Sequence, residues 1–346
     1  MAEYAHLSTP NPEIAEDLKA LAQFPRPSSY LVVRESVKSM VTPAVVKALE
    51  PDLPAESEYE IKDYMIDTAD GSGVRVLARS LVPRKMAPEE TFPLLFWIHG
   101  GGFCAGSADL DDPFLKIICV KLRVSVVNCE YRLAPEHPFP TGLNDSYAVL
   151  QHVASNPNQF SASFHKGFIV AGSSSGANFS AVLALRARDD PAFKDTPLTG
   201  QALLVPNVIH IDAYPNIPEE LRSQLLSVEQ NPNAPGFGRE DIEMMKNNYK
   251  ALNPSDPFVS PLLAPSHKGL PPAFIQVAGF DPLRDEGFLY EKVLKNNGVS
   301  TRLIVYPGAP HVIQYYFPQK EVGKKFRVDL EDGLHWLLSF SSQKCD

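Results

Sequence analysis

One ten-residue stretch, residues 169–178, constrains the fold of this 346-residue chain more than any other. It contains Gly172-x-Ser174-x-Gly176, which follows a short apolar run typical of a buried strand and precedes a helical spacing of apolar residues. A strand that turns directly into a helix needs glycines beside the turn, because side chains there would collide with neighbouring strands. The hydroxyl of Ser174 is then pushed outward at the positive end of the helix, which is the position of a nucleophile. The alternative is a tight turn whose serines only cap the helix.

Short apolar runs recur along the chain with helical patterns between them, and this alternation predicts a mainly parallel sheet with helices on both faces. The first two runs alternate polar and apolar residues around the turn Asp70-Gly71-Ser72-Gly73, which is typical of an antiparallel hairpin. The eight expected strands are residues 58–67, 74–82, 92–98, 125–129, 167–171, 201–206, 273–279 and 301–306. The expected helices that cover them are residues 144–153, 177–185, 286–294 and 326–340.

Two segments do not follow this rhythm. Residues 1–50 have only the spacing of helices, and residues 206–271 contain several prolines and one amphipathic helix pattern, residues 242–249, but no strand pattern. A connection of that length is too long for a plain loop in a compact domain. We therefore expect a single domain, residues 1–346, in which residues 1–50 and the insertion 206–271 form a helical cap over the site.

A serine hydroxyl becomes a nucleophile when a base takes its proton and an acid orients that base. Both partners are expected after strand ends, at the edge of the sheet where Ser174 lies. His311 follows the last predicted strand and is the candidate base. Asp281 is the first carboxylate after the preceding strand, whereas Asp285 and Glu286 come later, where they favour the start of a helix. The order Ser, Asp, His along the chain is the order that a doubly wound hydrolase sheet requires.

Three consecutive glycines, residues 100–102, follow a predicted strand and leave backbone N–H groups able to approach a ligand closely. We expect the N–H groups of Gly101, Gly102 and Ser175 to form an oxyanion hole. His99, just before the glycines, is expected to brace this loop with hydrogen bonds. Apolar residues flank the glycines, which favours a packed loop over a flexible linker.

Charge and composition argue against several classes of function. A formal net charge of −9 argues against a nucleic acid or an anionic membrane as partner. The chain contains no run of 18 apolar residues, so we expect no membrane span. The acidic first thirty residues lack the apolar core of a signal peptide. The cysteines lack metal-ligand spacing, so we expect no metal site and interpret them as reduced thiols of a cytoplasmic protein. They are Cys104, Cys119, Cys129 and Cys345.

Four motifs together resemble the hormone-sensitive-lipase-like family of α/β-hydrolases in order and spacing, over about residues 58 to 341. They are His99-Gly100-Gly101-Gly102, Tyr131-Arg132-Leu133-Ala134-Pro135-Glu136, Gly172-x-Ser174-x-Gly176 and Asp281-x-Leu283-Arg284-Asp285-Glu286-Gly287. The resemblance implies an α/β-hydrolase fold, carboxylesterase activity on small or medium acyl groups, a helical cap and no cofactor. The site residues that it implies are a catalytic triad of Ser174, Asp281 and His311 and oxyanion donors at Gly101, Gly102 and Ser175.

Three positions depart from the pattern of the family. Ser173 stands where an acidic residue is frequent, and Ala177 stands where a glycine is frequent. Neither position supplies chemistry, so these two departures bear on subfamily and loop packing. Val312 follows the histidine in place of the common glycine, which bears on the geometry of that loop.

The sequence therefore predicts a serine carboxylesterase that hydrolyses short- to medium-chain esters through an acyl-enzyme, with a small-molecule ester as its partner. An acyltransferase or a lactone hydrolase of a biosynthetic pathway would use the same triad, because water and alcohols attack through the same base. A third interpretation is a small-ligand receptor on this fold. Such receptors typically lose the base, and His311 is present here. Whether two copies form a homodimer is left open.

Overall fold

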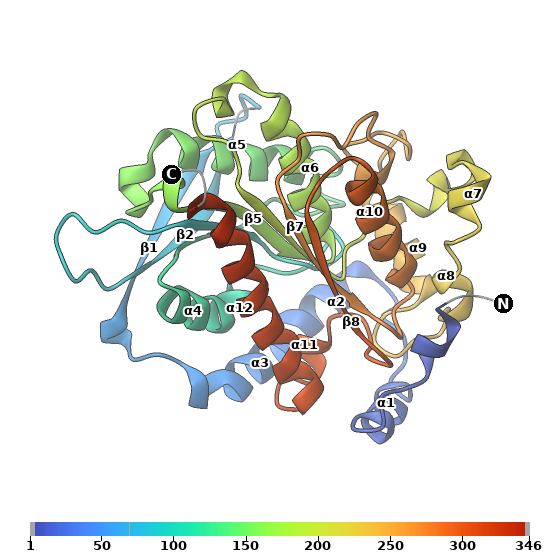
Figure 1. Ribbon diagram of the computed structural model, residues 1–346. Coiled ribbons are helices and arrows are strands. Elements are labelled where there is room, and N and C mark those ends of the chain that lie inside the picture. Colours follow the sequence, from blue (N-terminus) through green and yellow to red (C-terminus); the bar gives the residue numbers. More distant parts are fainter. Residues whose placement is uncertain (1–3, 69, 343–346) are drawn as a thin grey trace.

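Eight strands form one twisted sheet in the order β1-β2-β4-β3-β5-β6-β7-β8 (Figure 1). The computed structural model describes residues 4–68 and 70–342. β1 pairs antiparallel with β2 and β2 with β4, whereas all the other neighbours run parallel. The strands are β1 Tyr59–Asp67, β2 Arg75–Pro83, β3 Leu94–Ile98, β4 Ser125–Cys129, β5 Phe168–Ser173, β6 Gly200–Leu204, β7 Ala273–Ala278 and β8 Thr301–Tyr306. All eight predicted strands and the antiparallel hairpin are confirmed.

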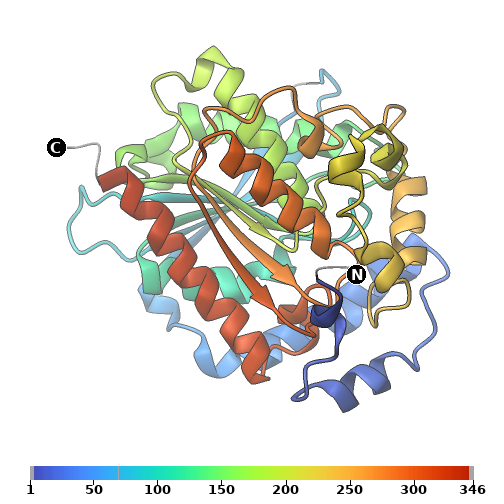
Figure 2. The ribbon, with the colours of Figure 1, turned by 45° about the vertical axis from the view of Figure 1, so that its right-hand side comes forward.

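Alternate side chains of the buried strands enter two separate cores, as the two-residue period of a strand requires. In β3, Leu94, Phe96 and Ile98 belong to the core that also contains side chains of α5, α6 and α10, whereas Leu95 and Trp97 belong to the core that contains side chains of α3, α4 and α12. Figures 1 and 2 show these two layers of helices on opposite faces of the sheet. The helices are α3 Thr42–Leu49, α4 Ala108–Leu122, α5 Thr141–Ser155, α6 Ser175–Asp189, α10 Arg284–Asn296 and α12 Glu321–Ser342. The predicted mainly parallel α/β fold is confirmed.

α4 is not among the helices predicted from sequence. Its first turns contain Asp109, Asp111, Asp112 and Pro113, a composition that resembles a loop. Aspartates near a helix N-terminus are stabilised by the helix dipole, and a proline in the second turn removes only one backbone hydrogen bond. Asp111 is buried and accepts a hydrogen bond from Trp97 Nε1 at 2.8 Å, so the start of α4 is fixed by the sheet below it.

The two segments without a predicted strand are helical in the structure, and residues 4–50 and 206–271 contain no strand. The first segment contains a π-helical turn, Val37–Val41, that leads into α3, the last of its α-helices. The second segment connects β6 to β7. α2 of the first segment lies beside α9 of the second (Figure 2). The helices are α1 Ala15–Leu21, α2 Tyr30–Ser36, α7 Glu219–Arg222, α8 Ser227–Gln230 and α9 Arg239–Tyr249.

The structure also describes the helices and the cysteines that the sequence raised. None of the helices within the described residues is both long enough and apolar enough to cross a membrane. Cys104, Cys119 and Cys129 are buried free thiols, and burial raises the pKa of Cys104 and Cys119 to about 12. Such thiols are unreactive at neutral pH. Cys345 lies outside the described residues.

Candidate active site

Ser174 stands at the sharp turn between β5 and α6, with φ 55° and ψ −115°. Its backbone N–H donates to Leu204 O at 2.8 Å, which fixes the turn to β6. The flanking glycines are required sterically, because an added Cβ would lie 2.5 Å from Ile98 O at Gly172 and 2.1 Å from the same oxygen at Gly176. The predicted strand–turn–helix geometry is therefore present, and its tip carries the hydroxyl of Ser174.

Ser174, His311 and Asp281 form one hydrogen-bonded row at the carboxyl edge of the sheet. Asp281 follows β7, and its Oδ2 accepts from His311 Nδ1 at 2.6 Å, while its Oδ1 accepts from Leu283 N at 2.8 Å. With Nδ1–H donating to the carboxylate, His311 Nε2 accepts from Ser174 Oγ at 2.9 Å. All three residues of the row are buried, so water competes little for these hydrogen bonds. The structure brings together the three side chains that the sequence singles out.

The backbone conformation of the residue after His311 explains why many members of the resembling family have a glycine at this position. Val312 has φ 49° and ψ 46°, a left-handed conformation that a β-branched residue rarely adopts. The single turn α11, Ile313–Tyr316, follows and is held by its side chains. Tyr315 OH donates to Asp111 Oδ1 at 2.6 Å, and burial raises the pKa of Asp111 to about 6. Gln314 Nε2 donates to Ser173 Oγ at 3.2 Å. Side-chain hydrogen bonds thus hold α11 in place directly behind His311.

The glycine loop after β3 lies beside Ser174. Gly102 and Ser175 line the same cavity as Ser174, whereas Gly101 does not line it, and its carbonyl accepts from the N–H groups of residues 104 and 105. His99 braces the loop as expected: its Nδ1 donates to the carbonyl oxygen of the next residue at 2.8 Å. Burial lowers the pKa of His99 to about 4, so the ring is neutral and structural.

The two later carboxylates of the Asp281 loop face the insertion and not His311. Asp285 Oδ2 accepts from Leu226 N at 2.8 Å. Glu286 Oε2 accepts from Val208 N at 2.8 Å, and its Oε1 accepts from Tyr214 OH at 3.0 Å. Because it is buried, the pKa of Glu286 is raised to about 8. These two acids therefore hold the start and middle of the insertion against α10.

Two arginines join the N-terminal segment to the rest of the site. Arg34 of α2 donates to the carbonyl oxygens of Cys104 and Ala134, which lie in the loops after β3 and β4. Arg26 pairs with Asp241 at the start of α9. The N-terminal segment is thus tied both to the glycine loop and to the insertion.

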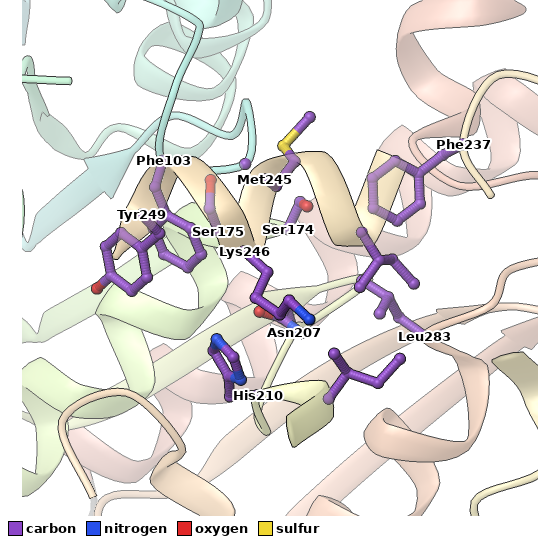
Figure 3. Close-up of a pocket in the computed structure, with 13 residues that line it drawn as sticks. Phe103, Ser174, Ser175, Asn207, His210, Phe237, Met245, Lys246, Tyr249 and Leu283 are labelled. Carbon is purple, nitrogen blue, oxygen red and sulfur yellow. The ribbon is translucent and has the colours of Figure 1, made fainter. Parts of the chain in front are cut away.

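A narrow cavity of about 50 Å³ lies over Ser174 (Figure 3). α9 forms much of its wall with Ile242, Met245 and Tyr249, and Phe237 closes another side. The Phe237 ring also stacks on His311, with ring centroids 4.4 Å apart. Ile242, Met245 and Tyr249 lie in the predicted helix 242–249, but the sequence alone does not place them in the wall of this cavity. Phe237 stands in a proline- and glycine-rich stretch whose path depends on tertiary contacts. Within residues 4–68 and 70–342, no cluster of three or more histidine, cysteine or acidic residues could hold a metal ion.

The sheet topology and the buried serine, histidine and aspartate are those of an α/β-hydrolase. A family model described as "alpha/beta hydrolase fold" matches residues 95–315. The chain belongs to this family, of the hormone-sensitive-lipase-like carboxylesterase type, as the sequence motifs predict.

Relatives across fungi and bacteria are similar over most of their length. An AB hydrolase superfamily protein of Schizosaccharomyces pombe is 35% identical over 97% of this chain and 96% of its own. A versiconal hemiacetal acetate esterase of Dothistroma septosporum is 32% identical, covering 88% and 89%. A carboxylesterase of Mycobacterium tuberculosis is 34% identical, covering 81% of each chain.

Two solved structures match closely. A vibralactone cyclase superposes with a TM-score of 0.91 at 40% identity, covering 97% of each chain. A hyperthermophilic esterase of Pyrobaculum calidifontis superposes with a TM-score of 0.79 at 28% identity, covering 98% of this chain and 100% of its own. Esterases therefore recur among both the relatives and the solved structures.

Proposed function

We propose that this protein is a serine carboxylesterase that hydrolyses short- to medium-chain carboxylic esters through an acyl-enzyme. The observation that carries the proposal is the buried hydrogen-bonded row of Ser174, His311 and Asp281 beside an apolar cavity. A serine whose hydroxyl donates to a neutral imidazole, itself oriented by a carboxylate, is the arrangement that activates oxygen for acyl transfer. The carboxylesterases among the relatives support the same reaction class.

In the proposed mechanism, Ser174 Oγ attacks the ester carbonyl carbon while His311 Nε2 takes the hydroxyl proton. The N–H groups of Gly101, Gly102 and Ser175 stabilise the negative charge that develops on the carbonyl oxygen. His311 then gives its proton to the departing alcohol, and Asp281 stabilises the imidazolium in between. In the second half of the reaction, a water molecule attacks the acyl carbon while His311 takes its proton. His311 then returns a proton to Ser174 Oγ, and the carboxylic acid leaves. No cofactor or metal is part of this proposal.

We also propose that residues 1–50 and 206–271 act as a cap that limits acyl length. The cavity is narrow, and its walls come largely from α9 and Phe237 of the insertion. A roofed cavity excludes water but holds a short chain, whereas an enzyme acting on oil droplets needs a broad open apolar surface. The three buried free thiols among the described cysteines support a reducing, cytoplasmic location.

A second candidate function is lactone chemistry or acyl transfer to an alcohol, with the same triad. The similarity to a vibralactone cyclase, at 40% identity over 97% of this chain, specifically favours it. A lactone is an internal ester, so attack by Ser174 would open it, and attack of a tethered hydroxyl on the acyl-enzyme would close one. Hydrolysis and cyclisation then differ only in which oxygen attacks second.

The experiment is a turnover screen with fluorophosphonate labelling of the full-length protein. p-Nitrophenyl esters of two to sixteen carbons and a panel of lactones are assayed in parallel. We expect labelling of Ser174 and best turnover with about two to eight acyl carbons, as the resemblance to the family implies. Faster conversion of lactones than of any ester would favour the second candidate. A protein that neither labels nor turns over any ester or lactone would contradict both enzymatic candidates and leave the receptor interpretation.

A further inference from the structure

His210, at the start of the insertion, presents an unused hydrogen-bond donor in the cavity of Ser174. Its side chain lines that cavity, and Figure 3 shows the ring extending from the chain toward Asn207, Lys246 and Tyr249. The residue is only 8% exposed. Among the described residues, its Nε2 has no hydrogen-bond partner although that atom is buried.

The position of the proton on this ring follows from its other nitrogen. His210 Nδ1 accepts a hydrogen bond from Asp212 N at 3.2 Å, so Nδ1 carries no hydrogen. Burial lowers the pKa of His210, which keeps the ring neutral, and the remaining proton is therefore on Nε2. A buried N–H without a partner is costly and uncommon in folded proteins, so its presence in a substrate cavity calls for a ligand that supplies the acceptor.

The charges around His210 indicate what kind of acceptor fits. Lys246, the cation that also lines this cavity, has its Nζ 3.1 Å from Asp212 Oδ1 and 2.5 Å from Glu243 Oε2. Two carboxylates therefore neutralise that ammonium, and the cluster of the three carries a net negative charge. A carboxylate or phosphate on the substrate would be repelled here, whereas an ether, hydroxyl or ketone oxygen would accept from a neutral N–H without charge repulsion.

We propose that His210 Nε2 donates a hydrogen bond to a neutral oxygen of the substrate, so that the natural substrates are oxygenated esters or lactones and not plain alkyl esters. This assignment rests on the proposed function, because it needs Ser174 to act on an ester in the same cavity. It makes His210 a specificity-determining residue. An apolar wall formed by Ile211, Ile242 and Phe237 would hold the hydrocarbon part of the same substrate.

The test compares esters in which one oxygen replaces one CH₂ group. The acyl pair is p-nitrophenyl 3-methoxypropanoate against p-nitrophenyl pentanoate, and the alcohol pair is 2-methoxyethyl butanoate against butyl butanoate. Each series is extended by moving the oxygen along the chain. The ratio of kcat/KM between the two members of a pair is measured for the wild-type enzyme and for His210→Phe, so that differences in intrinsic reactivity cancel.

We expect this ratio to fall about tenfold in His210→Phe for at least one oxygen position, the effect of losing one buried hydrogen bond. His210→Gln, which keeps an N–H donor, should retain part of the preference. Ile242→Val, which changes the cavity without changing a donor, should alter both members of each pair alike. Equal ratios in the wild-type enzyme and His210→Phe at every oxygen position would overturn the assignment.

Two further measurements show whether a change in these ratios comes from misfolding. Fluorophosphonate labelling and the thermal unfolding midpoint show whether His210→Phe is folded with an intact Ser174. If it is unfolded, the same ratios are compared in His210→Leu, which also lacks a donor, and His210→Gln, which keeps one. Wild-type turnover with unchanged ratios rejects only the role of His210. Absence of labelling and of turnover in the wild-type protein rejects the esterase proposal and this assignment together.

Discussion

Two regions of the candidate site are held in place differently. One is the edge of the sheet that carries Ser174, Asp281 and His311, and the other is the insertion that covers this edge. Backbone hydrogen bonds fix the edge: Ser174 N donates to Leu204 O, and Phe280 N donates to Ala309 O, both at 2.8 Å. The insertion, residues 206–271, contains no strand and is held by side chains: its own apolar residues, such as Ile209 and Leu262, enter the core, and the buried carboxylates of Asp285 and Glu286 accept from its backbone.

This difference separates two kinds of substitution. At the sheet edge, the backbone remains in place when a side chain changes, so losses should appear as lost chemistry in a folded protein. In the insertion and the N-terminal segment, the same side chains that could touch substrate also hold the fold. Changes there should therefore alter selectivity and stability together.

The largest effect is expected at the serine itself. Ser174→Ala removes the nucleophile and should lower kcat by about 10³-fold or more while leaving the unfolding midpoint nearly unchanged. Ser175→Ala is the matched control, because it keeps the backbone N–H and removes only a neighbouring hydroxyl. Initial rates with a p-nitrophenyl ester, together with fluorophosphonate labelling, measure the difference. Labelling of Ser174→Ala at the wild-type level would contradict the assignment.

The second effect separates the carboxylates of one loop. Asp281→Asn should lower kcat by about 10²- to 10⁴-fold, because an amide at this position favours the wrong tautomer of His311. Asp285→Asn leaves the buried guanidinium of Arg284, whose Nε donates to Asp285 Oδ1 at 2.8 Å, without its charged partner. It should lower the unfolding midpoint with a much smaller effect on kcat. Steady-state kinetics and thermal unfolding of both variants show which carboxylate acts in catalysis and which stabilises the fold. An inactive but fully stable Asp285→Asn would exchange the two roles.

The third effect concerns the contact between the N-terminal segment and the glycine loop. Arg34→Met leaves the carbonyls of Cys104 and Ala134 without their donor, so the loop loses part of its support. We expect kcat/KM to fall about five- to twentyfold and the acyl-length profile to broaden. Arg188→Met is the control, because Arg188 also donates to two carbonyls but at the far end of α6. An unchanged profile in Arg34→Met would show that the N-terminal segment does not shape the cavity.

The same contrast explains what could be predicted from sequence. Ser174, Asp281 and His311 each follow a strand of a parallel sheet, and parallel strands bring their carboxyl ends to one edge, so order along the chain was enough. Phe237 could not be identified in this way, because it stands among prolines and glycines, where no periodic pattern fixes the path of the insertion. Met245 lies in the predicted helix 242–249, but the pattern fixes only the helix and not its position over Ser174. The helix α4 was missed for a related reason, since Pro113 and its neighbouring aspartates have local preferences that packing against the sheet overrides.

A fourth prediction uses the burial of Glu286. Burial raises the pKa of this carboxyl from 4.5 to about 8, so between these values the folded state binds a proton that the unfolded state releases. The resulting stability is complete below pH 4.5 and is lost as the pH rises toward 8, by roughly 1–3 kcal/mol. Glu286→Gln carries no titratable proton and should flatten this part of the curve of unfolding free energy against pH. Glu291→Gln, on the same helix beside Lys295, is the control. If the free energy of unfolding of the wild-type protein rose between pH 4.5 and 8, and Glu286→Gln abolished that rise, the inferred direction of the pKa shift would be wrong.

The smallest effect should come from the loop after His311, where the contact between Tyr315 and Asp111 supports the sheet edge. Tyr315→Phe removes the donor to Asp111, and we expect kcat to fall about three- to tenfold with KM unchanged, because α11 then holds His311 less firmly. Val312→Gly relieves the left-handed valine but adds freedom to the unfolded chain, so its net effect on stability should lie within about 1 kcal/mol.

The double variant sharpens this last prediction. A glycine adopts the left-handed conformation without support from α11, so Val312→Gly should restore most of the kcat that Tyr315→Phe loses. Tyr147→Phe, which removes an equivalent hydrogen bond to Asp190 far from His311, is the control and should not respond to Val312→Gly. Kinetics well below the unfolding midpoint separate positioning from stability. Additive losses in the double variant would mean that the Tyr315–Asp111 contact supports the fold without setting the position of His311.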